Sequence, residues 1–503
     1  MKHNDSPLHV RGVSLFVDDL PISNDLVHAA VVPSPVAHGK LNAVDVTDAL
    51  ALPGVFAVFT ATDIPGQNQI GNIIQDEPLL AEGEVDYVGQ PVAVMVARDE
   101  RTARQAAQRV KLDIEELPAV FDAREAWRKG QLLLPPRTLS LGDVDAAWEA
   151  CDVVVDGHVE TGGQEHLYLE TQVTVALPIE KGRLKLICAT QSASAVQRIV
   201  AGVLGVPMHE IEVEVPRLGG AFGGKEDQAT SWACLAALAA SKLNQPVKLS
   251  LRRQEDMRWT GKRHPYSSDF KIGLSRDGRI LAYQVTFYQN GGAAADLSPA
   301  VLERSLFHAT GGYTIPNVRV TGISCRTNLP PNTAFRGFGA PQAFFVIEAA
   351  IHKAASVLGL DALEIQRKNL VREGYTFPYG MRARNSRTRL CWDETEKHYE
   401  LEGIRNRVEA YNRANLFSKK GAAAIPLCFG ISFTSTFLNQ ASALVHVYTD
   451  GSVSVSTAAV EMGQGVKTKI QQVAARALGI PPERVHVEFT NTTRIANMSP
   501  TAA

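Results

Sequence analysis

The sequence predicts an α/β (α+β) protein of several domains, and three observations lead to that prediction. At 503 residues, the chain is long enough for more than one hydrophobic core. Strand-like runs alternate with stretches of helical period along most of the sequence. Two Asp-Gly pairs, Asp277-Gly278 and Asp450-Gly451, stand between alternating apolar runs and predict antiparallel hairpins.

Composition argues against several classes of function. Apolar residues make up 45% of the chain and the formal net charge is -2, so no excess of positive charge favours nucleic acid. No apolar run approaches the roughly 20 residues of a membrane span, and the N-terminus lacks a signal-peptide core. The six cysteines form no CxxC pair, which disfavours a zinc ribbon or a cysteine-ligated cluster. We predict a cytoplasmic protein with reduced thiols and with no membrane or nucleic-acid partner.

The first 125 residues predict a compact α/β unit. Strands are expected over Val55–Ala61, Val88–Ala97 and Lys111–Leu117, and an amphipathic helix over Asp99–Val110. The next stretch, Trp127–Asp143, has no clean period and contains a Pro-Pro pair, so it is predicted to be a linker.

Alternation of strands and helices then resumes. A strand is predicted over Lys185–Gln191, followed by a helix over Ser192–Gly205 for which Ser192 is a candidate N-cap. Long helices are predicted over Pro341–Leu358 and Thr395–Asn412.

The segment GGAFGGKE (Gly219–Glu226) lies between a predicted strand, Ile211–Leu218, and a predicted helix, Asp227–Leu243. Unobstructed backbone N–H groups at such a turn bind anions. The segment matches most of a P-loop, but Glu226 replaces the Ser/Thr that would hold magnesium, and its carboxylate would repel a triphosphate. We expect a ligand loop for something other than ATP, with tight helix–sheet packing as the structural alternative.

Three further segments are candidate ligand loops or core. Arg336 lies between aromatic residues in TNLPPNTAFRGFGAPQ, and Gln464 lies between two glycines at a predicted helix start in EMGQGVKTK. Phe433, in the apolar period-2 run GISFTSTF, is by itself more typical of a core residue. The pair Glu303-Arg304 is by itself more typical of a protein surface.

The order of these segments is far more specific than any one of them. The motifs VGQPVAVMVA, ATQ, GGAFGGKE, AFRGFGAPQ, FGISFTSTFLNQ, EMGQG and SPTAA follow one another along the chain. This order resembles the molybdenum part of the molybdenum hydroxylase family, which includes the xanthine dehydrogenases and aldehyde oxidases. The resemblance implies an α/β hammerhead domain in residues 1–125, a linker in 126–142, a molybdopterin-binding domain in 143–390 and an incomplete second one in 391–503.

The resemblance also implies a site. It predicts molybdenum held by molybdopterin with no protein ligand on the metal, and it assigns cofactor contacts to Gln191, Phe222, Gly223, Arg336, Gln464, Ala502 and Ala503. Thr501 is expected to belong, with Ala502 and Ala503, to a loop that lines the active site. Of these, Gln191, Phe222, Arg336 and Ala503 are expected to lie nearest the metal, through outer contacts or backbone. Gln191, Gly223, Arg336 and Gln464 are expected to surround one cavity. Substrate contacts are assigned to Glu226, Arg304, Phe338, Phe433 and Thr434.

The implied reaction oxidises hypoxanthine and xanthine to xanthine and urate, with water as the oxygen source. Electrons would pass to [2Fe-2S] clusters and FAD on a partner subunit and then to NAD, in a dimer of heterodimers. The resemblance assigns the catalytic roles in this chain to Glu226 and Arg304. Their joint presence also favours purines over aldehydes as substrates. The alternatives are an aldehyde or N-heterocycle hydroxylase of the same family, or a truncated non-catalytic remnant.

By the same resemblance, the glutamate that acts as general base in the family would follow the last residue of this chain. Loss of a general base typically costs about 10²–10⁴ in rate. We therefore expect residues 1–503 alone to bind molybdenum cofactor poorly, to associate through exposed apolar surface, and to show no measurable xanthine hydroxylation. Metal content and turnover of the purified chain check this. Stoichiometric molybdenum with turnover would mean that another carboxylate in the chain is the base.

Overall fold

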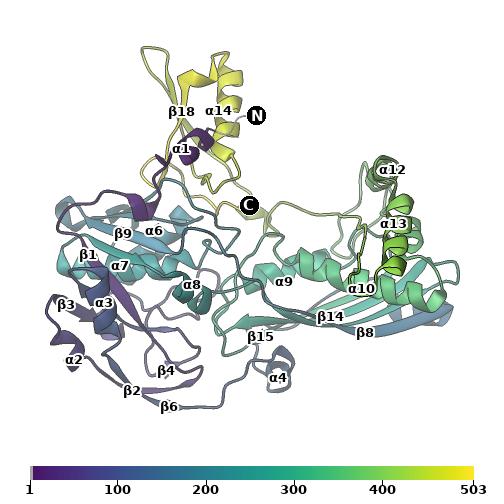
Figure 1. Cartoon of the computed structure of the whole chain (residues 1–503), viewed down its shortest axis with the longest axis horizontal. Coiled ribbons are helices and arrows are strands. Elements are labelled where there is room, and N and C mark those ends of the chain that lie inside the picture. The colour runs from purple at the N-terminus through teal and green to yellow at the C-terminus, as the bar shows by residue number, and fades with distance from the viewer. Residues whose placement is uncertain (1–3, 503) are drawn as a thin grey trace.

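Two large sheets organise the chain in the computed structural model, which describes residues 4–502 (Figure 1). The larger sheet has eight strands in the order β19-β11-β10-β9-β12-β1-β5-β3. Their bounds are β1 Val27–Pro33, β3 Val55–Phe59, β5 Pro91–Ala97, β9 Val173–Pro178, β10 Leu184–Cys188, β11 Ile211–Val215, β12 Val247–Ser250 and β19 Thr490–Asn491. This sheet joins strands from three distant parts of the sequence.

The pairing of β1 with β12 crosses the predicted boundary between the first two domains. These strands run parallel, with Val27 opposite Val247 and Ala29 opposite Leu249. Their buried apolar residues belong to one core that also includes both helices on this sheet, α6 (Ala193–Leu204) and α7 (Ala229–Leu243). The first 125 residues therefore share a sheet and a core with later residues, and the proposed division into domains stays a prediction.

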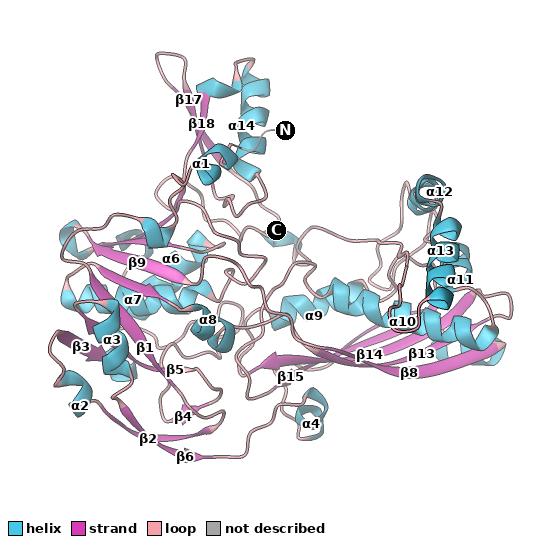
Figure 2. Ribbon diagram, in the orientation of Figure 1, coloured by secondary structure: helices cyan, strands magenta, loops and turns pink. Residues whose placement is uncertain are grey.

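The second large sheet has five strands in the order β7-β15-β14-β13-β8. Their bounds are β7 Arg137–Leu141, β8 Val153–Thr161, β13 Tyr266–Leu274, β14 Ile280–Gly292 and β15 Asn317–Arg326. The helices α9 (Ser298–Phe307) and α10 (Ala340–Leu358) cover one face of this sheet (Figure 2). The site described below lies where the two sheets approach each other.

Smaller elements complete the described chain. One three-stranded sheet consists of β4 (Glu84–Val85), β2 (Gly39–Asp45) and β6 (Lys111–Glu116), and another of β16 (Ala443–Val447), β17 (Val453–Thr457) and β18 (Val485–Val487). The remaining α-helices are α1 Ser6–Val10, α2 Thr47–Leu50, α3 Glu100–Ala107, α4 Ala123–Arg128, α5 Val144–Ala147, α8 Arg253–Trp259, α11 Ala362–Asn369, α12 Thr388–Tyr399, α13 Leu401–Ala414 and α14 Val466–Leu478.

The N-terminal end of the described chain lies beside the helix α14. Backbone N–H of Asn4 donates to Thr468 Oγ1 at 3.0 Å, and its side chain donates to Gln471 Oε1 at 2.7 Å. The short helix α1 therefore lies beside α14 at the top of the molecule (Figure 1).

Most predicted elements are confirmed, including both hairpins: β13 pairs antiparallel with β14, and β16 with β17. The predicted helix Thr395–Asn412 is wrong as a single helix, because Glu400 has φ of 50° and separates α12 from α13. The stretch Trp127–Asp143, predicted to be a linker, contains the edge strand β7, which pairs with β15. Ser192 is at the N-cap of α6, but its side chain makes no capping hydrogen bond.

Among the described residues, no single helix is both long and apolar enough to span a membrane. Only α10 and α11 taken together reach the necessary length and hydropathy, and they meet at an angle of 119°. The buried side chains of α10 belong to the core under the five-stranded sheet.

Candidate active site

The GGAFGGKE segment forms the loop between β11 and α7, and it adopts a strained backbone. Phe222 has φ of 57° and Gly223 has φ of 102°. A Cβ at Gly223 would lie 2.7 Å from the carbonyl oxygen of Ala334, so only glycine permits this approach of the two loops. Positive φ at a bulky residue such as Phe222 costs about 1–3 kcal/mol and is typical of functional loops.

The AFRGFG loop lies directly against this segment. Arg336 N–H donates to the Phe222 carbonyl at 2.9 Å. His166, which sequence reasoning missed, donates from Nε2 to the Ala334 carbonyl at 2.7 Å and stacks on Phe335 with a centroid distance of 4.5 Å. Burial lowers the pKa of His166 to about 4, which keeps the imidazole neutral. His166 therefore holds the AFRGFG loop in place as a structural donor.

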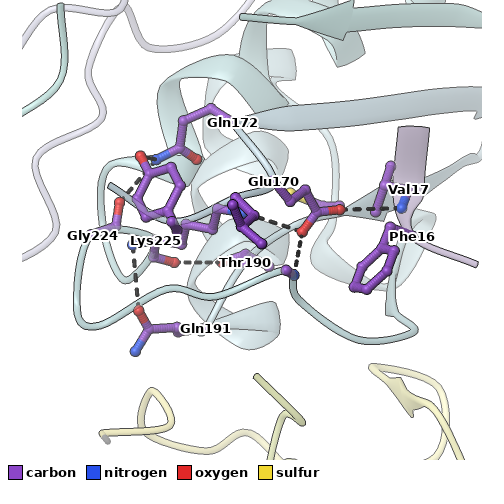
Figure 3. A network of polar contacts seen from close by, with 12 residues as sticks. Phe16, Val17, Glu170, Gln172, Thr190, Gln191, Gly224 and Lys225 are labelled. Atoms are coloured by element: carbon purple, nitrogen blue, oxygen red, sulfur yellow. Dashed lines mark hydrogen bonds and ion pairs between the residues drawn. The ribbon is translucent and has the colours of Figure 1, made fainter. Parts of the chain in front are cut away.

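Lys225 points into the protein and forms a buried ion pair. Its Nζ lies 3.1 Å from Glu170 Oε2, and both side chains are almost fully buried. Glu170 also accepts from Gly219 N–H at 2.8 Å and from Val17 N–H at 3.2 Å (Figure 3). Burial lowers the pKa of Lys225, and the Glu170 charge opposes that shift. This lysine holds the loop in place, so the structure gives no support to phosphate binding of the P-loop type.

Gln191 connects that loop to the C-terminal segment. Its Oε1 accepts from the N–H groups of Gly223 and Lys225 at 3.0 and 3.3 Å, and its own N–H donates to the Lys225 carbonyl at 2.8 Å (Figure 3). On the other side, Gln191 Nε2 donates to the Thr501 carbonyl at 2.8 Å, and Thr501 N–H donates to the Gln191 carbonyl at 2.9 Å.

These loops enclose a cavity of about 360 Å³. Most of the predicted site residues line it: Gln191, Phe222, Gly223, Glu226, Arg304, Arg336, Phe338, Phe433 and Ala502. Residues that the prediction missed complete the lining: Ala334, Phe335, Gly337, Phe429 and Ile431. The sequence offered a signal for most of them, since they lie within the two motifs already singled out.

Three of the assigned residues that the structure describes, Thr434, Gln464 and Thr501, are not part of the wall of this cavity. Ala503 lies outside the described residues. Gln464 folds back on its own loop, where Nε2 donates to the Val460 carbonyl and Oε1 accepts from Met462 N–H. The expectation that Gln464 shares a cavity with Gln191, Gly223 and Arg336 is therefore wrong. The Gln464 loop instead borders a second cavity of about 470 Å³, through Met462 and Gly463, on the side of Gly219 and Gly220.

Glu226 is buried at the cavity wall, and its surroundings disfavour ionisation of its carboxyl. Burial raises the pKa of its carboxyl well above the usual value, and the nearby Asp227 and Asp296 raise it further. Among residues 4–502, no side chain or backbone group donates to this carboxyl. Both effects favour the protonated form of the Glu226 carboxyl, which can donate a hydrogen bond.

Arg304 is the cation at this wall. It extends from α9, and its Nη1 and Nη2 donate to the carbonyls of Gly430 and Ser432. Its Cζ lies 5.5 Å from the centroid of the Phe429 ring. Burial lowers the pKa of Arg304, but a guanidinium stays protonated in proteins.

The side chains that line the cavity offer no direct ligands for a metal ion. They could hold a metal only as part of a cofactor that supplies the metal ligands. Among the described lining residues there is no thiol and no imidazole, and burial raises the pKa of the one carboxyl. The remaining polar groups are an amide, two guanidinium groups and backbone. Such groups bind a cofactor by hydrogen bonds and do not ligate a metal directly.

Comparisons with known proteins agree with this chemistry. Three family models match the chain: the aldehyde oxidase and xanthine dehydrogenase a/b hammerhead domain over residues 11–118, and two molybdopterin cofactor-binding domains over 129–370 and 394–503. The chain belongs to the xanthine dehydrogenase and aldehyde oxidase family. It carries a hammerhead domain and both molybdopterin cofactor-binding domains, which confirms the predicted family, fold class and molybdopterin cofactor.

The curated relatives extend beyond this chain. Mouse xanthine dehydrogenase/oxidase is 41% identical over 504 residues, covering 100% of this chain and 38% of the relative. Xanthine dehydrogenase from Oryza sativa subsp. japonica is 41% identical, covering 100% of this chain and 37% of the relative. The chain therefore spans about two fifths of the length of these relatives.

Solved structures of the family share the fold. The aldehyde oxidoreductase of Desulfovibrio gigas superposes with a TM-score of 0.89 at 26% identity, covering 99% of this chain and 57% of that one. Quinoline 2-oxidoreductase of Pseudomonas putida 86 superposes with a TM-score of 0.87 at 27% identity, covering 100% of this chain and 68% of that one.

The buried ion pair generates a prediction on stability. Lys225→Met is expected to lower the free energy of unfolding by about 3–5 kcal/mol, because it leaves the Glu170 carboxylate buried without its cation. Lys111→Met is the matched control: its pair with Asp48 is exposed, and its loss is expected to cost about 1 kcal/mol or less. Chemical denaturation of both variants measures the difference. Equal small effects would show that the ion pair is not the support described here.

Proposed function

We propose that this chain is the molybdenum part of an enzyme that oxidises hypoxanthine and xanthine to xanthine and urate, with water as the oxygen source. The observation that carries the proposal is that Glu226 and Arg304 line one cavity with Phe338 and Phe433. Two aromatic rings suit a flat heterocycle, while a neutral acid and a guanidinium suit its ring nitrogens and oxygens. The names of the mouse and rice relatives agree with this substrate class.

The cavity residues divide into a cofactor side and a substrate side. Gln191, the Phe222-Gly223 backbone, Arg336 and Ala502 would hold the molybdenum cofactor in this cavity. The Gln464 loop borders the second cavity through Met462 and Gly463, and Gln464 is proposed to contact the cofactor from that side. When bound, the cofactor supplies the two-electron redox chemistry of the hydroxylation. Thr434, beside Phe433 in the chain, is proposed as a residue at the substrate end of the pocket.

On the substrate side, stacking on Phe338 and Phe433 would contribute about 0.5–1.5 kcal/mol per aromatic pair. Glu226, as a neutral acid, would donate a hydrogen bond to the heterocycle. Arg304 would stabilise negative charge that develops on the ring during the reaction. Its Nε is buried and has no partner among the described residues, so the guanidinium keeps hydrogen-bonding capacity.

The same proposal includes the partners. Electrons would leave to [2Fe-2S] clusters and FAD on a partner subunit and then reach NAD, within a dimer of heterodimers. The three family models that match this sequence are a hammerhead domain and two molybdopterin cofactor-binding domains, and the proposal places the other centres on a partner subunit.

A second candidate is an aldehyde or N-heterocycle hydroxylase of the same family. The observation that favours it is structural: the superposed neighbours include an aldehyde oxidoreductase and a quinoline 2-oxidoreductase. A non-catalytic remnant is the third candidate. Substrate profiling of the loaded enzyme separates all three.

The first test replaces the two recognition residues together. Glu226→Val with Arg304→Met is expected to abolish xanthine turnover and to keep part of any aldehyde oxidation, since both polar contacts to the purine are lost. Glu125→Val with Lys129→Met, an exposed ion pair on α4, is the matched control and should leave both activities unchanged. Steady-state kinetics on both substrates measure the effect. Unchanged xanthine kinetics in the first variant would contradict the roles assigned to Glu226 and Arg304.

The second test addresses the charge state of Glu226. Its raised pKa means that the carboxyl is neutral at low pH and ionises as pH rises through the raised value. The wild-type kcat/KM for xanthine should therefore fall at high pH as the donor proton is lost, whereas Glu226→Gln should keep a neutral donor and lack that limb. Glu226→Gln should also retain far more activity than Glu226→Val. A pH profile shared by wild type and Glu226→Gln would argue against a neutral donor.

A further inference from the structure

The cavity wall that contains Phe429, Ile431 and Phe433 has no regular secondary structure of its own. No α-helix or strand is assigned between the end of α13 at Ala414 and the start of β16 at Ala443, and the only helical turn there is a 3₁₀ turn at Thr436–Leu438. Ile431 is 87% exposed. A loop of this kind keeps one conformation only where neighbouring side chains hold its backbone.

Two side chains at the C-terminal end of α9 hold this loop. Arg304 donates to the Gly430 and Ser432 carbonyls. His308, four residues later, accepts a hydrogen bond from Gly430 N–H on Nε2 at 3.0 Å. Residues four apart lie on the same face of a helix, so the two side chains bind both polar groups of the Gly430 backbone from one side.

The hydrogen bonds of His308 permit a single tautomer. Its Nδ1 lies 2.8 Å from the Arg304 carbonyl, an acceptor, so Nδ1 must donate. Its Nε2 faces a backbone N–H, a donor, so Nε2 must carry the lone pair. A second proton on this ring would face the Gly430 N–H. Burial also lowers the pKa of His308 to about 4, in agreement with a neutral ring.

His308 also packs on the wall itself. Its ring centroid lies 5.2 Å from that of Phe429 and 5.8 Å from that of Phe344 on α10. A phenyl ring at this position would keep these contacts but would leave Gly430 N–H without an acceptor. Packing and hydrogen bonding at His308 are therefore separable by substitution.

We infer that His308 is a positioning residue for the substrate pocket: by accepting from Gly430 N–H, it fixes the loop to which Arg304 is bonded and on which Phe433 is carried. Without this bond, the loop keeps its two hydrogen bonds from Arg304 but loses the one at Gly430 N–H, and the position of Phe433 relative to the guanidinium is expected to become less fixed. The consequence is selective, because a flat heterocycle needs both groups, whereas a small aldehyde needs neither. The predicted effect on substrate selectivity rests on the proposed function, whereas the predicted effect on the loop does not.

The experiment compares His308→Phe, which keeps the ring and removes the acceptor, with His308→Gln, whose side-chain amide can accept near the position of Nε2. Hydrogen–deuterium exchange of the peptide covering residues 428–433 in the full chain reports directly on the Gly430 bond. Gly430 is exposed and its hydrogen bond to His308 is part-buried, so loss of this bond is expected to cost about 1 kcal/mol, which corresponds to protection reduced about fivefold in His308→Phe. Protection in His308→Gln should stay within about twofold of wild type, because it regains the hydrogen bond.

The kinetic arm uses the loaded enzyme with xanthine and with an aldehyde. In His308→Phe, kcat/KM for xanthine should fall about fivefold, with aldehyde oxidation within about twofold, and His308→Gln should recover most of the xanthine activity. Equal loss for both substrates, or equal protection of residues 428–433 in the two variants, would overturn the inference. Absence of xanthine turnover in the wild type would refute the proposed function instead, while the exchange arm would still test His308.

Discussion

The buried ion pair between Lys225 and Glu170 is the interaction on which the site depends. Glu170 binds the Lys225 ammonium, Gly219 N–H and Val17 N–H at once. A cation and a carboxylate taken out of water are stable only when paired and hydrogen-bonded, and loss of either leaves a buried charge. This requirement holds the GGAFGGKE loop against the N-terminal segment, and it turns the lysine away from the cavity that a phosphate-binding loop would serve.

From this pair, one chain of polar contacts extends across the site. The Lys225 backbone bonds to Gln191 in both directions, and Gln191 bonds to Thr501 in both directions. Thr501 Oγ1 then accepts from Val460 N–H at 3.0 Å, next to the Gln464 loop. Segments more than 300 residues apart in sequence thus fix one another. Such mutual support makes the positive φ at Phe222 and Phe338 tolerable, since the surrounding contacts exceed the local cost.

Local patterns in the sequence predicted most loops and residues of the site. Features that depend on contacts between distant segments could not be predicted in this way. Glycine-rich turns, hairpin pairs and motif order identified the loops, and most residues assigned to the site line one cavity. The prediction that Gln464 lines the same cavity was wrong because its side-chain amide makes its hydrogen bonds within its own loop. The spacing of residues along the chain does not reveal such bonds. His166 and His308 were missed because a lone histidine carries no sequence signal, and their roles depend on carbonyls and amides brought near by folding. The break at Glu400 was missed because glutamate is a good helix former.

The electrostatics of the cavity follow from what is buried beside it. Asp227 and Asp296 lie close to Glu226 and have raised pKa values of their own, to about 6 and about 8. Three buried carboxyls in one region oppose one another's ionisation, and this favours the protonated form of the carboxyl at the cavity wall. The Arg304 guanidinium at the same cavity cannot become neutral. Protonated Glu226 can therefore donate a hydrogen bond without carrying a charge, while Arg304 carries a fixed positive charge. Together they would stabilise a flat ring on which negative charge develops during the reaction. A substrate that develops no such charge would be stabilised less.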